Sequence, residues 1–252
     1  MAIQPFQLPY SANAVRDLRD RLARTRWPDT IPGSGWEYGF ELEYLQRVCR
    51  HWQEQYDWKA EIEWLSRLHH LQYITGDQSI HFVHERGRGP APIPIVLFHG
   101  WPGSFLEMLN LVPRLTDPAS HGGDSADSFD VIVPSLPGFG FSSRPTERGM
   151  NTARMASLFA ELMSELGYER FASHGGDFGA GVSSWLGHRH AARIIGLHLN
   201  YIPGVLQARP PTRRGLKSGR TTVSRGRGHV GRRVWGLTTI FSFARRKPSP
   251  TD

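Results

Sequence analysis

The chain has 252 residues, 39% of them hydrophobic, and eight tryptophans, which is enough apolar material for one large α/β domain or two smaller ones. The single cysteine, Cys49, excludes an intrachain disulfide. Because the sequence has neither an apolar leader nor a run of about 18 apolar residues, we expect a cytoplasmic protein with no membrane contact. The formal charge of +7 lies in residues 205–252, whose 12 Lys/Arg and one acid carry +11 and leave residues 1–204 at −4, so we do not expect a nucleic-acid partner for the body of the chain.

The first part of the chain is predicted to be helical. Ser11 fits the N-cap of an amphipathic helix that ends before Pro28, since proline disfavours a helical residue before it. Apolar residues at helical spacing predict a second helix over residues 41–55, and residues 60–68 are expected to form a third, shorter one. Nothing in this part suggests chemistry, and we interpret it as packing structure.

A β-hairpin is predicted next, with strands over residues 70–75 and 79–85. His81 and His84 invite a metal interpretation, but they stand three residues apart on one strand and therefore point to opposite faces. We expect no metal ligands there, and none at the preceding His69-His70 pair.

Strands and helices then alternate. After a linker at residues 90–94, apolar runs typical of buried parallel strands begin at Ile95, Phe129, Phe171 and Ile194. The helices expected between them cover residues 105–115 (broken at Pro113), 152–166 and 180–190. This alternation predicts a parallel sheet with right-handed crossovers, which binds ligands beyond the carboxyl ends of its strands.

Two loops at such strand ends carry the candidate chemistry. One is HGWPGS at residues 99–104, and the other is GGDFG at residues 175–179. The second is a small-x-nucleophile-x-small turn, in which small residues must flank a nucleophile held in a strained conformation. Its centre is Asp177. Gly-Gly-Asp alone is ordinary turn chemistry, so the prediction depends on the two loops meeting in one site.

A carboxylate at this turn selects a particular reaction. Asp177 is ionised at neutral pH and needs no base to attack the sp³ carbon of an epoxide or alkyl halide. The product is an ester, which activated water can hydrolyse, whereas a serine would form a stable ether. The backbone N–H groups of Trp101 and Phe178 are expected to form the oxyanion hole for the hydrolytic step. The substrate pocket is expected to include His99, Pro102 and Phe139.

Three motifs together resemble one family. HGWPGS, PSLPGFGFS at residues 134–142 and HGGDFG at residues 174–179 are similar to the pattern of epoxide hydrolases of the α/β-hydrolase fold. The N-terminal helices and first strands resemble the microsomal-type branch and the juvenile-hormone epoxide hydrolases. Without the membrane anchor of the animal members, the chain is more similar to soluble bacterial ones. The resemblance covers about residues 3–204.

The resemblance has several implications. It implies an α/β-hydrolase-type, mostly parallel sheet preceded by a helical region and a hairpin. It also implies hydrolysis of a small-molecule epoxide to a vicinal diol through an ester on Asp177, with no cofactor and no metal. A part in epoxide metabolism, aromatic hydrocarbon catabolism and detoxification would follow. The oligomeric state stays open.

The chain departs from the family pattern after the nucleophile. The family also uses a His/acid pair to activate water and lid tyrosines to protonate the opening epoxide. Beyond Asp177 the only acid is Asp252 and the only tyrosine is Tyr201. We do not expect the histidines there to act as the base; they are His188, His190, His198 and His229.

Composition divides the chain into three regions. These are an N-terminal region at residues 1–90, the first half of the hydrolase core at residues 91–204, and a basic tail at residues 205–252. The tail has too little apolar periodicity to fold alone. We expect that the reading frame has shifted or been truncated near Gly204, so that the lid and the last strands are missing. The alternative is an RGG-type tail that binds nucleic acid.

Two other functions stay open. A haloalkane dehalogenase would share the aspartate turn, but it would commonly carry tryptophan after the nucleophile, where this chain has Phe178. A non-catalytic or vestigial protein is favoured by the missing His/acid pair, which also argues against sustained turnover.

Overall fold

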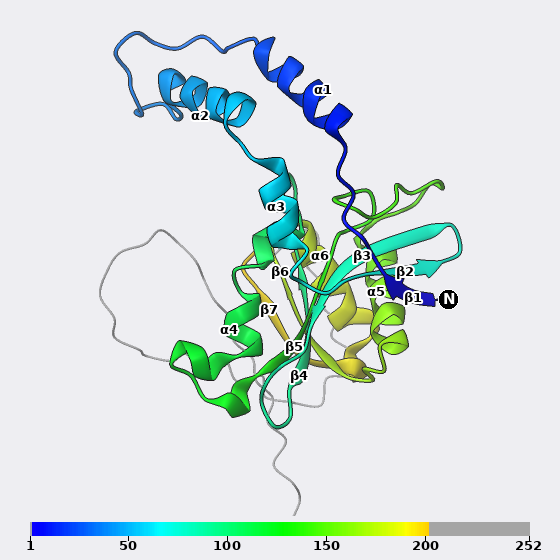
Figure 1. The fold of residues 1–252 in the computed structure, drawn as a ribbon. Coiled ribbons are helices and arrows are strands. Elements are labelled where there is room, and N and C mark those ends of the chain that lie inside the picture. The colour runs from blue at the N-terminus through cyan, green and yellow to red at the C-terminus, as the bar shows by residue number, and fades with distance from the viewer. Residues whose placement is uncertain (1, 202–252) are drawn as a thin grey trace, which may run out of the picture. The chain divides into compact units, whose positions relative to one another are not determined.

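The structure is a computed structural model that describes residues 2–201 (Figure 1). It divides into two compact units: Phe6–His70 form one, and the residues up to Pro5 together with those from Leu71 onward form the other. The expected basic tail, residues 205–252, and the expected break near Gly204 lie outside the described residues. No helix within the described residues is long and apolar enough to cross a bilayer.

The Phe6–His70 unit contains three helices, as predicted: α1 (Ala12–Ala23), α2 (Leu42–Glu54) and α3 (Trp58–Leu65). Ser11 caps α1, because its side chain accepts a hydrogen bond from the Ala14 N–H at 3.2 Å. The third helix begins two residues before the predicted start. The reason is Asp57, whose carboxylate accepts hydrogen bonds from the N–H groups of Lys59 and Ala60.

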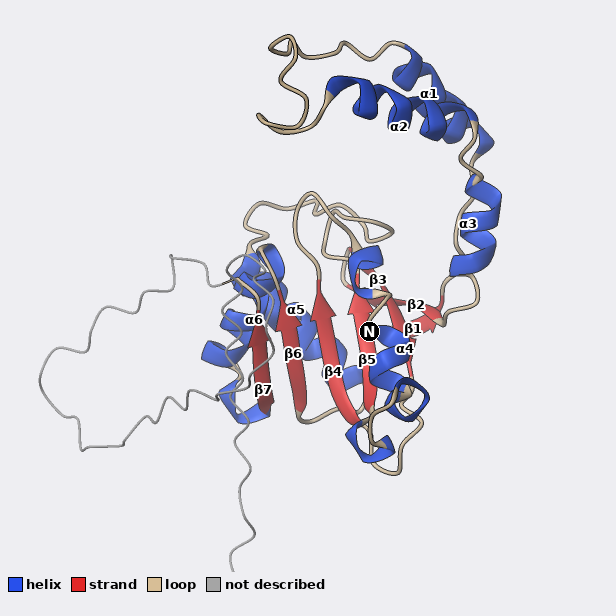
Figure 2. Cartoon of the chain, turned by 90° about the vertical axis from the view of Figure 1, so that its left-hand side faces the viewer, coloured by secondary structure: helices blue, strands red, loops and turns tan. Residues whose placement is uncertain are grey.

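The other unit is built on a seven-stranded sheet in the order β1-β2-β3-β5-β4-β6-β7. Strand β4 pairs in parallel with β5 and β6, and β6 pairs in parallel with β7, so the arrows of β4, β5 and β6 end at the same edge (Figure 2). The pairs β1–β2 and β3–β5 are antiparallel. The predicted α/β-hydrolase-type, mostly parallel sheet is confirmed, with its antiparallel pairs on the β1 side. The strands are β1 (Ala2–Pro5), β2 (His70–Thr75), β3 (Gln78–Glu85), β4 (Ile93–Phe98), β5 (Phe129–Pro134), β6 (Phe171–Gly175) and β7 (Ile194–Leu199).

The two faces of this sheet pack differently. Val96 and Phe98 of β4 point into the main core, where the ring of Phe98 lies 4.7 Å from that of Phe159 on α5 (Thr152–Glu165). Helix α6 (Phe178–Arg189) packs on α5 and on β6. The alternate residues Ile95 and Leu97 point to the opposite face, as the period of a strand requires.

Two sequence predictions were wrong in detail, and one strand was missed. Residues 105–115 are not one helix but a 3₁₀ turn, η1 (Phe105–Met108), followed by α4 (Val112–Thr116). Pro113 lies in the first turn of α4, where its missing N–H costs no helical hydrogen bond. The expected linker at residues 90–94 overlaps β4, which begins at Ile93. Strand β1 was not predicted; further 3₁₀ turns are η2 (Pro118–His121), η3 (Ser125–Asp127) and η4 (Ala191–Arg193).

The predicted hairpin is present as β2 and β3, and from Leu71 onward it belongs to the same compact unit as the rest of the sheet. Its two histidines have different surroundings: His81 Nδ1 lies 2.9 Å from the Ser135 hydroxyl oxygen, and His84 Nε2 lies 3.1 Å from the Tyr168 hydroxyl oxygen. The expected region boundary after residue 90 stays a prediction.

Candidate active site

Asp177 stands at a sharp turn between β6 and α6. Its φ is 49° and its ψ is −121°, and it is the only non-glycine residue with positive φ among residues 2–201. Such a conformation costs about 1–3 kcal/mol and persists only where the surroundings enforce it. Gly175 makes the turn possible, because a Cβ there would lie 2.2 Å from the carbonyl group of Gly179. Steric exclusion therefore explains why this position of the motif is glycine.

The loop at residues 99–104 contacts this turn. The Trp101 N–H donates a hydrogen bond to Asp177 Oδ1 at 2.9 Å, across 76 positions of sequence. Gly100 permits the approach, since a Cβ there would lie 2.6 Å from the Cβ of Asp177. The Trp101–Pro102 peptide is cis. The two loops that the sequence placed at strand carboxyl ends therefore do meet.

Phe178 is the first residue of α6, where backbone N–H groups have no partner inside the helix. Within the described residues no acceptor meets the Phe178 N–H, whereas the Asp177 carbonyl accepts hydrogen bonds from the N–H groups of Ala180 and Gly181. A second donor is thus available next to the carboxylate. Its part in an oxyanion hole stays a prediction.

Aromatic side chains flank the carboxylate and are open to solvent. Trp101 is 66% exposed and Phe178 is 47% exposed. Phe139, from the loop after β5, is half-buried, and its ring centroid lies 6.5 Å from that of Phe178. With Pro102, which is also exposed, these residues form an apolar rim beside Asp177.

His99 does not belong to this rim. It is 0% exposed, and both of its ring nitrogens have backbone partners: Nδ1 lies 3.0 Å from the Gly100 carbonyl oxygen, and Nε2 accepts the Leu136 N–H at 3.0 Å. Burial lowers the pKa of His99, and the Gly100 hydrogen bond only partly offsets this. The expectation that His99 lines the substrate pocket is therefore wrong, because its fully buried side chain cannot contact a substrate.

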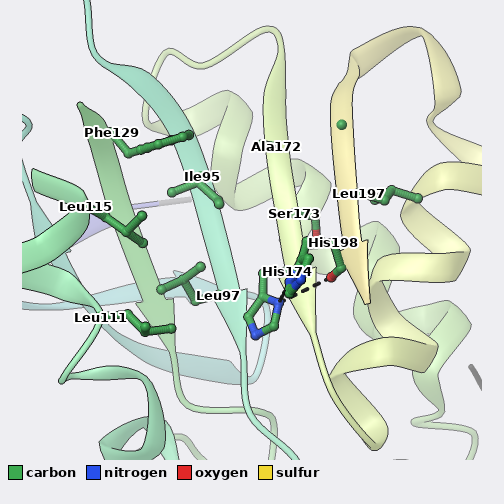
Figure 3. A pocket seen from close by; sticks show the side chains of 11 residues that line it. Ile95, Leu97, Leu111, Leu115, Phe129, Ala172, Ser173, His174, Leu197 and His198 are labelled. Atoms are coloured by element: carbon green, nitrogen blue, oxygen red, sulfur yellow. Dashed lines mark hydrogen bonds between the residues drawn. The ribbon is translucent and has the colours of Figure 1, made fainter. Parts of the chain in front are cut away.

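Another pair of histidines lies elsewhere; of the two, only His198 was considered from the sequence, where it was not expected to act as the base. His174 and His198 occupy paired positions on β6 and β7; their rings stack at 4.8 Å and their Nδ1 atoms lie 2.7 Å apart. They line an apolar cavity of about 250 Å³, with Ile95 and Leu97 among its other walls (Figure 3). No residue of the loops at 99–104 or 175–179 lines it, so this cavity is separate from the Asp177 site.

No cluster of three or more metal-ligating side chains occurs within the described residues. The arrangement around Asp177 is instead a carboxylate with one backbone donor and an apolar rim. It suits attack on a carbon electrophile by the carboxylate.

Comparison with known proteins agrees with this geometry. Residues 3–108 match the family model of the epoxide hydrolase N terminus, and residues 93–212 match that of the alpha/beta hydrolase fold. A putative epoxide hydrolase of Stigmatella aurantiaca is 44% identical over 210 residues, which is 83% of this chain and 48% of that relative. The chain is therefore similar to epoxide hydrolases over most of its length.

Other epoxide hydrolases are similar over a comparable length of this chain. Epoxide hydrolase 1 of Oryctolagus cuniculus is 37% identical over 203 residues, covering 79% of this chain and 45% of that relative. The crystal structure of juvenile hormone epoxide hydrolase from the silkworm Bombyx mori matches with a TM-score of 0.69 and 32% identity, over 79% of this chain and 53% of that one. The chain thus spans about half the length of the curated relatives it matches. The resemblance to epoxide hydrolases predicted from the three motifs is confirmed.

Proposed function

We propose that this chain opens epoxides by nucleophilic attack from Asp177, as the first half of an epoxide hydrolase reaction. The observation that carries the proposal is the hydrogen bond from the Trp101 N–H to Asp177 Oδ1, made where Asp177 stands in a strained turn. That bond orients the carboxylate and distinguishes its two oxygens.

The first step follows from this distinction. Oδ1 is occupied by the Trp101 N–H, whereas no donor within residues 2–201 meets Oδ2. Oδ2 attacks one ring carbon of the epoxide, a C–O bond forms, and the ring C–O bond breaks. The departing oxygen keeps the electron pair and takes a proton from water. The product is a hydroxyalkyl ester of Asp177, and no cofactor takes part.

The second step would hydrolyse this ester. Water adds to the ester carbonyl, negative charge develops on Oδ1, and the N–H groups of Trp101 and Phe178 stabilise it. Collapse of this intermediate releases the diol and regenerates the carboxylate. The step needs a base, and residues 178–201 contain no Asp or Glu that would orient a histidine for that task. We therefore propose that the ester persists in this polypeptide.

The exposed rings of Trp101 and Phe178 and the half-buried ring of Phe139 favour an apolar epoxide. Styrene oxide is a suitable probe, since its phenyl ring can pack on such a rim. A part in detoxification or aromatic hydrocarbon catabolism, and a cytoplasmic location, stay predictions of the sequence.

Intact mass spectrometry tests the proposal. After incubation with styrene oxide, the chain should gain the mass of one styrene oxide, the modified peptide should contain Asp177, and the Asp177→Ala variant should gain nothing. Asp124→Ala, which removes an exposed carboxylate in a surface turn, is the matched control and should react like the parent chain.

Each alternative function has its own outcome. A folded chain that gains no mass would support a non-catalytic protein and overturn the proposal. Sustained diol release would show that the ester does not persist. An ester formed from an alkyl bromide but not from styrene oxide would favour a dehalogenase, although the Phe178 side chain has no N–H to offer a halide.

A further inference from the structure

The peptide group between Gly100 and Trp101 is held from both sides. Its N–H is the group that donates to Asp177 Oδ1 at 2.9 Å, and its carbonyl oxygen lies 3.0 Å from His99 Nδ1. Because a peptide is planar and its C=O and N–H point in opposite directions, fixing the oxygen also fixes where the N–H points. The two hydrogen bonds therefore act on one rigid unit.

The partners of His99 determine its protonation state. A backbone N–H can only donate, so His99 Nε2, which lies 3.0 Å from the Leu136 nitrogen, must be the unprotonated acceptor. A backbone carbonyl can only accept, so the proton is on Nδ1 and is donated to the Gly100 oxygen. This tautomer is assigned from the two neighbours, and only the neutral ring satisfies both.

We propose that His99 is a positioning residue, which holds the Gly100–Trp101 peptide so that its N–H faces the nucleophile; this inference rests on the proposed function of Asp177. A continuous series of hydrogen bonds runs from the Leu136 N–H after β5, through the imidazole and the peptide, to Asp177. Each bond in such a series polarises the next, so His99 also makes the Trp101 N–H a stronger donor.

The loop needs this restraint because little else fixes the peptide. The Trp101 side chain is 66% exposed and gives the backbone little packing support. Gly100 has no Cβ, since one would collide with Asp177, and it therefore has more backbone freedom than any other residue would. The fully buried imidazole of His99 supplies the rigidity that the exposed loop lacks.

Amide hydrogen exchange tests the positioning directly. His99→Leu removes both hydrogen bonds of the ring and should raise the exchange rate of the Trp101 amide about tenfold or more. His99→Asn retains an N–H near the position of Nδ1 and should restore most of the protection. His84→Leu removes another buried histidine, bonded to Tyr168, and should destabilise the chain without changing Trp101 exchange.

Reaction with styrene oxide separates this inference from the proposed function. Where the parent chain is alkylated at Asp177, the rate in His99→Leu should fall about tenfold while the half-saturating concentration stays the same. A parent chain without alkylation would overturn the proposed function, and the exchange of Trp101 would still decide whether His99 positions the peptide. Unchanged Trp101 exchange in folded His99→Leu would overturn the positioning role.

A measurement on the parent chain covers the case in which His99→Leu does not fold. The ¹⁵N shifts of the His99 ring should show a protonated Nδ1 and an unprotonated Nε2 at neutral pH. A proton on Nε2 would break the bond to Leu136 and overturn the inference.

Discussion

Two carboxylates at opposite ends of the same sheet, Asp130 and Asp177, have contrasting surroundings. Asp130 lies near the start of β5 and is 8% exposed. It accepts hydrogen bonds from the Gly87 N–H at 2.8 Å, the Arg86 guanidinium at 2.9 Å and the Tyr168 hydroxyl at 2.7 Å. Burial opposes ionisation of Asp130, but these three donors outweigh it and lower its pKa.

Asp177 follows the carboxyl end of β6 and accepts one hydrogen bond within the described residues, from Trp101. Its backbone is strained, whereas that of Asp130 is regular strand. Under the proposed function, one residue type serves two purposes in this protein. A carboxylate with every oxygen bonded stabilises the fold, and a carboxylate with a free oxygen on a strained turn is available for reaction.

The largest effect is expected from Asp177→Gly. Removing the carboxylate should abolish alkylation by styrene oxide completely, as seen by intact mass. Because glycine tolerates a φ of 49°, the same change should raise the free energy of unfolding by about 1 kcal/mol, measured with urea. A variant less stable than the parent chain would show that the turn is not strained, and the contrast with Asp130 would fail.

Gly100→Ala should have the next largest effect. The added Cβ would lie 2.6 Å from the Cβ of Asp177, so the loop must move away and the Trp101 N–H must leave Oδ1. A displacement of this kind should slow alkylation about 100-fold, followed by mass spectrometry over time. Gly123→Ala in an exposed turn is the control, because Gly123 has no positive φ and its added Cβ would lie 3.1 Å from the nearest atom, Pro118 Cβ. Equal rates in the two variants would contradict the close approach.

Asp130→Asn should affect the stability of the fold and not the reaction with styrene oxide. At neutral pH it should lower the free energy of unfolding by about 2 kcal/mol, since hydrogen bonds to a charged group are lost, and leave the alkylation rate unchanged. The lowered pKa means that the unfolded carboxyl binds a proton first as the pH falls. The stabilisation of the fold by ionised Asp130 is therefore present above the ordinary pKa of 3.8, and it is lost as the pH falls through the pKa of the folded state. Urea titrations from neutral to acid pH should show a shallower loss in Asp130→Asn than in Asp124→Asn.

The smallest effect is expected from the buried histidines. Burial, and to a lesser extent the charge of His198, lowers the pKa of His174 from its ordinary value of 6.5. Below pH 6.5 the imidazole of His174 binds a proton in the unfolded chain but not yet in the folded one. The free energy of unfolding therefore falls as the pH falls. His174→Gln should make the free energy of unfolding fall less at acid pH. This change should be smaller than the loss of free energy expected for Asp130→Asn. The exposed His121→Gln should leave the pH dependence of the free energy of unfolding unchanged.

Most of the sheet was predictable because apolar runs and alternation are local signals. The runs at Ile95, Phe129, Phe171 and Ile194 all became strands, and the turn at Asp177 was identified from its flanking glycines. Strand β1 was missed because Ala2–Pro5 is short and pairs with residues about 70 positions away. No local pattern contains that pairing.

The role of His99 was mistaken for a comparable reason. Its place in the HGWPGS loop suggested contact with substrate, but its Nε2 partner is Leu136, 37 positions along the chain. Only the parallel pairing of β4 and β5 brings the loops after those strands together. The alternation of strands and helices predicted a parallel sheet but not which strands are neighbours in it.

The Phe6–His70 unit leaves and rejoins the sheet at adjacent points. Pro5 and Leu71 are paired across β1 and β2, and the Phe6 N–H donates to the His70 carbonyl at 3.0 Å just beyond them. The unit is therefore a module inserted into what would otherwise be a simple β-hairpin, and a short turn joining Pro5 to Leu71 would close the same ladder. Exchange or deletion of this module would leave the strand order of the sheet that carries Asp177 as it is.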